Sequence, residues 1–307
     1  MLHYVAGRAW QAIITIFILL TLIFSAIRFT GDPTLSLLPL EASEADRNDL
    51  RQSLHLDEPI LIQFTAYLMD IASGDFGVSY KYHTPVTELL LDRLPVTLKL
   101  ALMAGGLTIG LGLPLGILAA RRRGAFADQA VLFMALIGQS VPIFVISLAC
   151  ILLFSVKLRI LPVAGVDNPL GYVLPVVTLA WFGMAAVIRV TRVSMLNVLG
   201  AEYIVTARAK GLSTTTIIYI HALRNALIPI VTIFSLIFAT LLTGTVVTET
   251  VFGLPGLGRL AVDAIINRDF PVVQGVVIFV TLMYILVNLC VDILYGLIDP
   301  RTRTGSW

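Results

Sequence analysis

Six long apolar runs, separated by polar segments, constrain the fold of this chain more than any other feature of its sequence. A helix needs roughly 20 apolar residues to cross a bilayer core about 30 Å thick. The first run lacks a convincing cleavage site of small residues behind it, so we expect a retained membrane anchor and not a secretion signal. The sequence predicts an all-α polytopic membrane protein with six transmembrane helices, at about 9–27, 97–120, 129–156, 172–190, 226–248 and 273–297.

The composition supports a membrane protein and argues against several other classes. Of the 307 residues, 58% are hydrophobic and 13% are charged, and the mean hydropathy is +0.93. Soluble proteins carry about 25% charged residues. Cys150 and Cys290 both lie inside apolar runs, so a disulfide framework is not expected. A net charge of +2 is too small to indicate a nucleic-acid-binding protein.

The distribution of Lys and Arg over the short loops predicts the orientation in the membrane. Cytoplasmic loops carry the excess of these residues. The short loops on one side hold four of them, Lys157, Arg159, Arg259 and Arg268. The other side holds eleven, so both termini are predicted to be cytoplasmic. The eleven are Arg8, Arg121, Arg122, Arg123, Arg189, Arg192, Arg208, Lys210, Arg224, Arg301 and Arg303.

The segment between the first two runs is long and acidic, and this orientation places it outside the cell. From about Phe29 to Pro95 it holds eleven acidic residues against four basic ones. We interpret most of this charge as a solvated face; the alternative is a surface that docks a partner or guides a cationic ligand. Helix-start signals predict three helices, from Ser43 toward Leu54, from Asp57 and Pro59 to Ile71, and from Thr84 and Pro85 to a point before Pro95.

These features divide the chain into four parts. Residues 1–28 form the cytoplasmic N-terminus and the first transmembrane helix, and residues 29–96 form a small helical external insertion. Residues 97–297 form a five-span core with a cytoplasmic loop at 191–226, and residues 298–307 form a cytoplasmic tail.

The longest polar interruption of the C-terminal half runs from Glu202 to Pro229 and reads EYIVTARAKGLSTTTIIYIHALRNALIP. Its pattern predicts a helix, a turn and a second helix. Gly211 stands where the first helix would end, and Ser213 can cap the second one. A compact helical element between two membrane spans has a shape that suits binding to another protein.

This stretch resembles the cytoplasmic loop of ABC importer permeases, whose pattern is E-A-A, three residues, Gly, nine residues and I-x-L-P. With Gly211 on the Gly of the pattern, E-A-A falls on residues 205–207 and I-x-L-P on residues 221–224. The spacing is kept, but Val205 replaces the Glu and Arg224 replaces the Pro. These departures resemble the dipeptide, oligopeptide and nickel branch, whose members read T-A-R-A-K-G-L and H-x-L-R-N-A.

The resemblance covers nearly the whole chain. It implies the architecture of a type I ABC importer permease in the cytoplasmic (inner) membrane of a prokaryote. The further matching segments are GDP at 31–33, LDEPILIQF at 56–64, GDFGVSY at 74–80, GQSVPIF at 138–144, VFGLPGLGRL at 251–260, NRDFPVVQG at 267–275 and DPR at 299–301.

The resemblance also implies the partners. They are a second homologous permease subunit forming a heterodimer, two ATP-binding cassette subunits, an extracytoplasmic solute-binding protein and membrane lipid, with no nucleic acid. ATP and Mg would be bound by the partner subunits, and no cofactor is expected in this chain. The loop would couple ATPase movement to the membrane spans. The predicted coupling residues are Glu202, Thr206, Ala207, Arg208, Ala209, Lys210, Gly211, Leu212, Ser213 and Ile217.

Small residues and prolines inside the spans predict close helix packing and kinks. Two small-xxx-small pairs, Gly106 with Gly110 and Gly112 with Gly116, are typical of a seam between helices. Pro114, Pro142 and Pro175 can each kink a span, because each removes a helical hydrogen bond.

Polar groups at membrane depth are costly unless they line a cavity or find partners. For Glu249 two interpretations stay open, a structural pair with Arg259 or Arg268 and a carboxylate that lines the pathway. The LPGLG turn cannot continue a helix, and we interpret residues 250–272 as a partly re-entrant external element of an outer gate. The candidate pathway or gate residues are Gln139, Ser140, Pro142, Thr243, Gly244, Thr248, Glu249, Pro255, Gly256 and Gly258.

No motif in the sequence supports catalysis or ATP binding. The patterns G-x-x-x-x-G-K-[ST], H-E-x-x-H and G-x-S-x-G are absent, and the four histidines lack metal-ligand spacing. We therefore predict a transport subunit and not an enzyme, with no catalytic and no metal-binding residues.

The predicted function is import of small peptides or of nickel and metal-chelate ligands, which the sequence does not separate. The alternative is a secondary transporter driven by an ion gradient. Such a carrier predicts internal repeats and ionisable groups near the bilayer midplane. The sequence shows no convincing repeat, and Glu249 and Asp292 lie near opposite ends of their runs.

Overall fold

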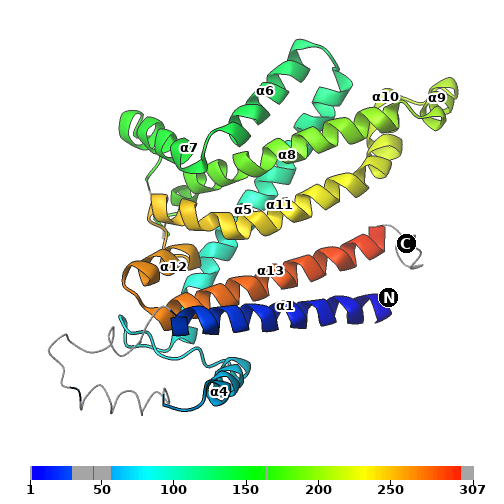
Figure 1. Ribbon diagram of the computed structural model, residues 1–307. Helices are drawn as coiled ribbons and strands as arrows, with labels where there is room; N and C mark the ends of the chain where they lie inside the picture. Colours follow the sequence, from blue (N-terminus) through cyan, green and yellow to red (C-terminus); the bar gives the residue numbers. More distant parts are fainter. Residues whose placement is uncertain (1, 30–43, 45–56, 164, 167, 299–307) are drawn as a thin grey trace. The chain divides into compact units, whose positions relative to one another are not determined.

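The computed structural model describes residues 2–29, 44, 57–163, 165, 166 and 168–298, and the regular elements in these residues are helices (Figure 1). The sequence-predicted helix from Ser43 to Leu54 and the C-terminal tail lie outside the described residues. The elements are α1 (Leu2–Phe29), α4 (Ile60–Ser73), α5 (Val86–Arg121), α6 (Phe126–Ser140), α7 (Ile143–Cys150), the π-helix η1 (Ile151–Lys157), the 3-10 helix η2 (Pro169–Tyr172), α8 (Val173–Leu199), α9 (Glu202–Ala209), α10 (Thr214–Thr216), the π-helix η3 (Ile217–Ala222), α11 (Leu223–Phe252), α12 (Leu257–Ile266) and α13 (Phe270–Ile298).

Four helical stretches are long and apolar enough to cross a bilayer. They are Val86–Arg121, Pro169–Leu199, Thr214–Leu242 and Phe270–Leu289, and the bent pair of α6 and α7 with η1 would make a fifth. The first predicted span coincides with α1, whose described apolar stretch, Trp10–Ser25, is shorter than this length. For the described residues the structure therefore confirms a helical architecture with four spans, or five if the bent pair is one span, while the count of six stays a prediction.

The third predicted span is broken in the middle. Its two halves, Phe126–Ser140 and Ile143–Lys157, are bent by 106°. The pyrrolidine ring of Pro142 disfavours helical backbone in the preceding residue, and Val141 is extended, with φ −92° and ψ 128°. The sequence predicted a kink at Pro142; the structure shows a helix that ends at Ser140 and a new one that begins at Ile143.

The chain divides into two compact units, and the larger one comprises the described residues of 96–259 and 286–298. Helix α8 is its centre and packs against α6, α7 and α11. Figure 1 shows α8 in green beside α11 in yellow. Exposed hydrophobic side chains such as Leu102, Phe133 and Leu236 suit a surrounding of lipid.

One of the two predicted glycine seams is confirmed and the other is not. A side chain at Gly112 would press on Val187 of α8, and one at Gly116 would press on Thr191 one turn further on. The absence of side chains thus lets α5 and α8 approach closely. Nothing lies within 4 Å of a Cβ atom at Gly106 or Gly110 in the described chain, so a seam at this pair stays a prediction.

The smaller unit contains the described residues of 2–95 and 260–285. In it, aromatic rings join α1 to α4: the centroids of Phe24 and Phe64 lie 5.2 Å apart, and those of Phe24 and Tyr67 lie 5.5 Å apart. The buried Asp269 carboxylate accepts hydrogen bonds from the Ser79 hydroxyl at 2.5 Å and from the backbone N–H of Tyr80 at 3.1 Å. This carboxylate fixes the segment before α5 to the corner between α12 and α13.

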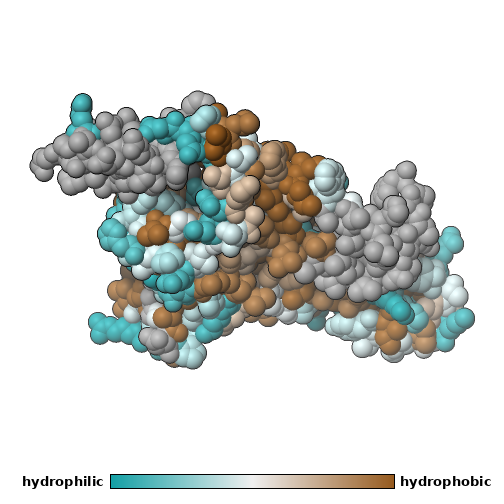
Figure 2. Space-filling model, turned by 90° about the horizontal axis from the view of Figure 1, so that it is seen from below, coloured by the Kyte–Doolittle hydropathy of each residue, from teal (hydrophilic) through white to brown (hydrophobic). Residues whose placement is uncertain are grey.

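The face in Figure 2 shows extended areas of exposed hydrophobic side chains, coloured brown. Exposed hydrophobic side chains of the described chain include Trp10 and Phe17 of α1 and Leu61 and Met69 of α4. Exposed apolar side chains in such numbers are unfavourable in water and favourable against lipid tails.

Candidate functional site

The predicted coupling residues form a closed helical turn. Helix α9 ends at Ala209, and Gly211 follows in the left-handed region with φ +76°. The N–H of Gly211 donates to the carbonyl of Arg208 at 2.9 Å, and that of Leu212 donates to the carbonyl of Ala207 at 3.3 Å. This is the pattern in which glycine closes a helix C-terminus. The prediction that Gly211 ends the helix is confirmed.

The predicted cap at Ser213 is confirmed as well. Its backbone is extended, and its hydroxyl oxygen accepts a hydrogen bond from the N–H of Thr216 at 3.2 Å. An extended residue whose side chain accepts from a free N–H of the first turn defines an N-cap. Three residues in sequence thus end one helix and begin the next.

The coupling loop, which we define as residues 202–217, is anchored on the ends of three long helices. Ile204 is fully buried and Ile217 nearly so, in a cluster with Ile117 of α5, Met195 of α8 and Ala226 of α11. The Asn225 side-chain amide donates to the Tyr203 hydroxyl at 3.0 Å and so ties α11 to α9. A force applied to this loop would therefore reach three helices through direct packing.

The predicted coupling residues divide into an exposed group and a buried pair. Ala207 and Ile217 lie in the core, so they support the loop and cannot contact a partner. Sequence reasoning missed two exposed side chains, Tyr203 and Val205; the signal was present, since Val205 occupies the pattern position where the family has Glu. The exposed group consists of Glu202, Thr206, Arg208, Ala209, Lys210, Gly211, Leu212 and Ser213.

Sequence reasoning also missed the ion pair between Asp128 and Arg192. The Arg192 guanidinium donates to both oxygens of Asp128, at 2.6 and 2.8 Å, and the N–H of Gly124 donates to the same carboxylate at 2.9 Å. Asp128 opens α6 and Arg192 lies near the end of α8, so the pair locks these two helices together. The residues are 64 positions apart, and local sequence carries no sign of their pairing.

Glu249 lies at a second candidate site, the corner between α11 and α12. Its carboxylate is fully buried and accepts hydrogen bonds from the Thr97 hydroxyl at 2.7 Å, from the N–H of Gly258 at 2.8 Å and from the N–H of Arg259 at 3.1 Å. The Thr97 hydroxyl in turn accepts from the N–H of Leu257 at 2.9 Å. Glu249 and Thr97 together cap the N-terminus of α12, which is the favourable end for a negative charge.

This geometry favours a structural role for Glu249, with partners other than the two arginine side chains that the sequence suggested. Gly256 is required here, because a Cβ atom at that position would overlap the Glu249 carboxylate. Gly253 ends α11 in the left-handed region with φ +66°. The prediction that the LPGLG turn interrupts the helix is confirmed, while its role as an outer gate stays a prediction.

The other candidate pathway residues do not form one cluster. Gln139, Ser140 and Pro142 are exposed at the break between α6 and α7. Thr248 is buried, and its hydroxyl has no hydrogen-bond partner among the described residues. Pro255 is half-buried and Gly258 is buried at the α11–α12 corner. The side-chain surroundings of Thr243 and Gly244 lie outside the described part of the structure.

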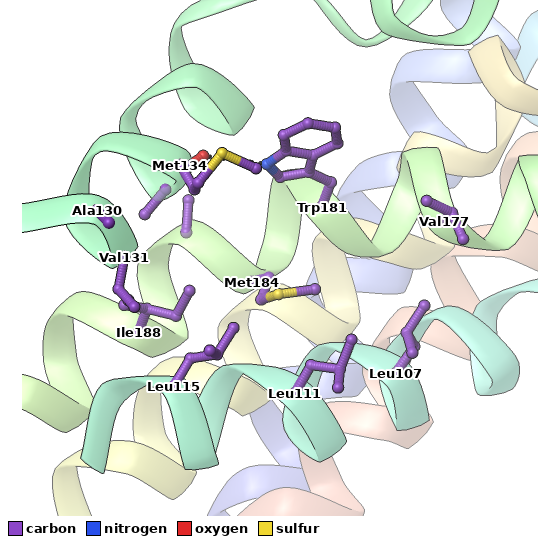
Figure 3. Close-up of a pocket in the computed structure, with 12 residues that line it drawn as sticks. Leu107, Leu111, Leu115, Ala130, Val131, Met134, Val177, Trp181, Met184 and Ile188 are labelled. Carbon is purple, nitrogen blue, oxygen red and sulfur yellow. Dashed lines mark hydrogen bonds between the residues drawn. The ribbon is translucent and has the colours of Figure 1, made fainter. Parts of the chain in front are cut away.

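An apolar cavity of about 450 Å³ lies between α5, α6 and α8 (Figure 3). Leu111 and Leu115 line it from α5, Met134 from α6, and Trp181 and Met184 from α8. The indole N–H of Trp181 donates to the carbonyl of Met134 at 3.1 Å. Since the lining is apolar and the indole donor is already used, the cavity offers little to the charged ends and amides of a peptide.

Comparison with solved structures shows a shared fold. The chain superposes on a chain of the inward-facing MetNI methionine ABC transporter with a TM-score of 0.59 and 21% sequence identity, covering 69% of this chain and 96% of the other.

Sequence comparison identifies the family. Residues 112–304 match the binding-protein-dependent transport system inner membrane component family, and residues 1–101 match the N-terminal region described for such membrane components. The chain belongs to this family and is a multi-pass membrane protein. The resemblance seen in the sequence is thereby confirmed.

Two relatives align over nearly the whole chain. The probable peptide ABC transporter permease protein y4tP of Sinorhizobium fredii is 41% identical over 307 residues, covering 97% of each chain. The dipeptide transport system permease protein DppB of Escherichia coli K12 is 38% identical over 336 residues, covering 99% of each chain.

Proposed function

We propose that this chain forms half of the translocation path of an ATP-driven importer of small peptides. It pairs with a second, similar permease, two ATPase subunits dock on the coupling loops of the two permeases, and a solute-binding protein delivers the substrate from outside. We further propose that the chain has six transmembrane helices, that both of its termini are cytoplasmic, and that residues 29–96 form an external insertion. Peptides are preferred over nickel or metal chelates because the relatives y4tP and DppB are named for peptide and dipeptide transport.

One observation carries the proposal: the coupling loop is rigidly anchored yet offers an exposed face. Ile204 and Ile217 hold it on three long helices, while Val205 and Leu212 remain 61% and 39% exposed. Exposed apolar side chains beside Arg208 and Lys210 are typical of a surface that a partner covers. A loop built in this way can transmit movement of the partner to the membrane spans.

Purification of the tagged chain from its own host in mild detergent tests the assembly. We expect a second permease and two ATPase subunits to co-purify. Uptake of a labelled dipeptide by sealed vesicles, with ion gradients collapsed, should then require ATP and the solute-binding protein. Uptake that persists without ATP would support the gradient-driven carrier instead, and uptake of a nickel chelate in place of dipeptides would change the substrate class.

A substitution at Gly211 tests the coupling role. A leucine there has room, since nothing lies within 4 Å of a Cβ atom, but it must adopt φ +76°, which costs a residue with a Cβ atom about 1–2 kcal/mol. We expect Gly211→Leu to rearrange the turn and to abolish most ATP-dependent uptake, with normal membrane insertion.

The matched control is Gly74→Leu, because Gly74 has φ +82° and equally open surroundings outside the coupling loop. It should keep its uptake. Wild-type uptake by Gly211→Leu, or an equal loss in both variants, would contradict a coupling role for the loop.

A further inference from the structure

A cleft of about 570 Å³ lies where the end of α5, the end of α8 and the coupling loop meet. Three arginines line it: Arg121 is the last residue of α5, Arg123 follows in the next turn, and Arg208 lies on α9. No acidic side chain is among the described residues that line the cleft. The proposed function uses Arg208 in the docking surface and leaves Arg121 and Arg123 unexplained.

The three charges are not neutralised within the described part of the chain. None of these arginines forms a close ion pair with a described carboxylate, although the Arg123 charge acts on Asp128 from a distance, and all three are exposed. Asp128, which follows the same turn, is already bound by Arg192 and by the N–H of Gly124. The cleft therefore presents an uncompensated positive charge that attracts an anion.

Part of the cleft wall is apolar. Leu199, Leu212 and Ile218 line it together with the three arginines. An inorganic anion gains nothing from contact with apolar side chains. A ligand with an anionic group and a hydrocarbon part can contact both the arginines and the apolar side chains. The cleft also lies at the ends of two apolar spans, Val86–Arg121 and Pro169–Leu199, which is the level of lipid headgroups.

We propose that this cleft binds the phosphate headgroup of an anionic phospholipid. The guanidinium groups of Arg121, Arg123 and Arg208 hold the phosphate, because planar guanidinium forks suit phosphate oxygens. Leucine and isoleucine side chains cover the glycerol and the first acyl carbons. The inference rests on the proposed function in one respect, the position of the coupling loop at the cytoplasmic membrane surface.

A bound lipid would bridge α5 and the coupling loop. Arg121 and Arg123 belong to the end of α5, whereas Arg208 and Leu212 belong to the loop, so one headgroup would join both. An acidic protein surface could pair equally well with Arg122 or Lys210, which do not line the cleft. The combination of a confined positive pocket with apolar walls favours the lipid.

Native mass spectrometry of the assembled transporter, released from nanodiscs of mixed phosphatidylglycerol and phosphatidylcholine, tests the proposal. The unaltered complex should retain phosphatidylglycerol in preference to phosphatidylcholine. In the double variant Arg121→Gln/Arg123→Gln this preference should fall by on the order of tenfold, since each basic residue contributes to lipid attraction. Arg122→Gln removes the same charge from the same turn outside the cleft and should keep the preference.

Three outcomes would overturn the proposal. An equal loss in Arg122→Gln would show diffuse surface charge, and full displacement of the lipid by excess inorganic phosphate would show a site for free phosphate. Normal lipid retention with loss of the ATPase subunits in the double variant would show a protein-docking surface. Absence of ATPase subunits from the unaltered complex would instead overturn the proposed function and leave the lipid measurement valid.

Discussion

The helix ends at Gly211 and Gly253 are closed by the same hydrogen bonds but have opposite surroundings. At the first, Gly211 donates to Arg208 and Leu212 donates to Ala207; at the second, Gly253 donates to Thr250 and Leu254 donates to Glu249. Both glycines have positive φ. After Gly211 the chain is exposed, whereas after Gly253 it enters a corner where Leu254, Gly256 and Leu257 are buried.

The comparison shows that the local sequence determines the conformation of the turn but not its role in the protein. The turn at Gly211 has an exposed outer face, and the buried side chains of Ile204 and Ile217 anchor it to the core. This arrangement suits a surface that binds a partner. The turn at Gly253 leads into α12, whose first amides are capped by a buried carboxylate. We propose the first turn as a docking surface, whereas the second turn lies in a buried corner of the fold.

Among the substitutions that test this comparison, Glu249→Ala is expected to have the largest effect on stability. The substitution removes the acceptor for two backbone N–H groups and the Thr97 hydroxyl, and each buried polar group left unpaired costs about 1–3 kcal/mol. We expect the free energy of unfolding in detergent to fall by about 3 kcal/mol or more. Glu249→Gln keeps one acceptor oxygen and should lose less; equal stability of all three proteins would show that the corner does not depend on the carboxylate.

Gly256→Ala and Gly211→Ala test the comparison directly, with a smaller expected effect on stability. At Gly256 a Cβ atom would overlap the Glu249 carboxylate, and overpacking of this kind costs about 1–3 kcal/mol. At Gly211 the space is open, so Gly211→Ala loses only about 1 kcal/mol through its positive φ. Thermal unfolding should rank Gly256→Ala below Gly211→Ala, and the reverse order would contradict the different surroundings of the two turns.

The smallest effect on stability is expected for Val205→Ser in the exposed face of the coupling loop. Val205 is 61% exposed, so its replacement should change the free energy of unfolding by no more than about 0.5 kcal/mol. Recovery of the ATPase subunits in a pull-down should nevertheless fall, because an apolar contact is lost. The neighbouring Ile204 is fully buried, and Ile204→Ser should instead destabilise the chain markedly. Unchanged recovery of the ATPase subunits with Val205→Ser would show that this side chain does not belong to the docking surface.

Local rules predicted the parts of the molecule that depend on neighbours in sequence. Gly211 and Ser213 were placed correctly because closing and capping a helix involve residues within a few positions of each other. The break at Pro142 was expected, but its sharpness was not, since the extended backbone of Val141 separates two helices instead of bending one.

Contacts between distant residues could not be predicted in the same way. Thr97 and Glu249 are 152 positions apart, and the sequence suggested nearby arginines as partners for the carboxylate. The burial of Ala207 and Ile217, two of the predicted coupling residues, depends on how three long helices converge, so the sequence did not reveal it. The glycines of the two predicted seams in α5 look alike in sequence, yet of these only Gly112 and Gly116 meet α8.

The bond between Asp128 and Arg192 has a consequence for the order of events during synthesis. The ribosome makes Asp128 64 residues before its partner. At 5–20 residues per second the interval is about 3–13 seconds. For that time the carboxylate at the start of α6 has no Arg192 guanidinium to bind. The bond that joins α6 to α8 can therefore form only after this part of α8 has been made.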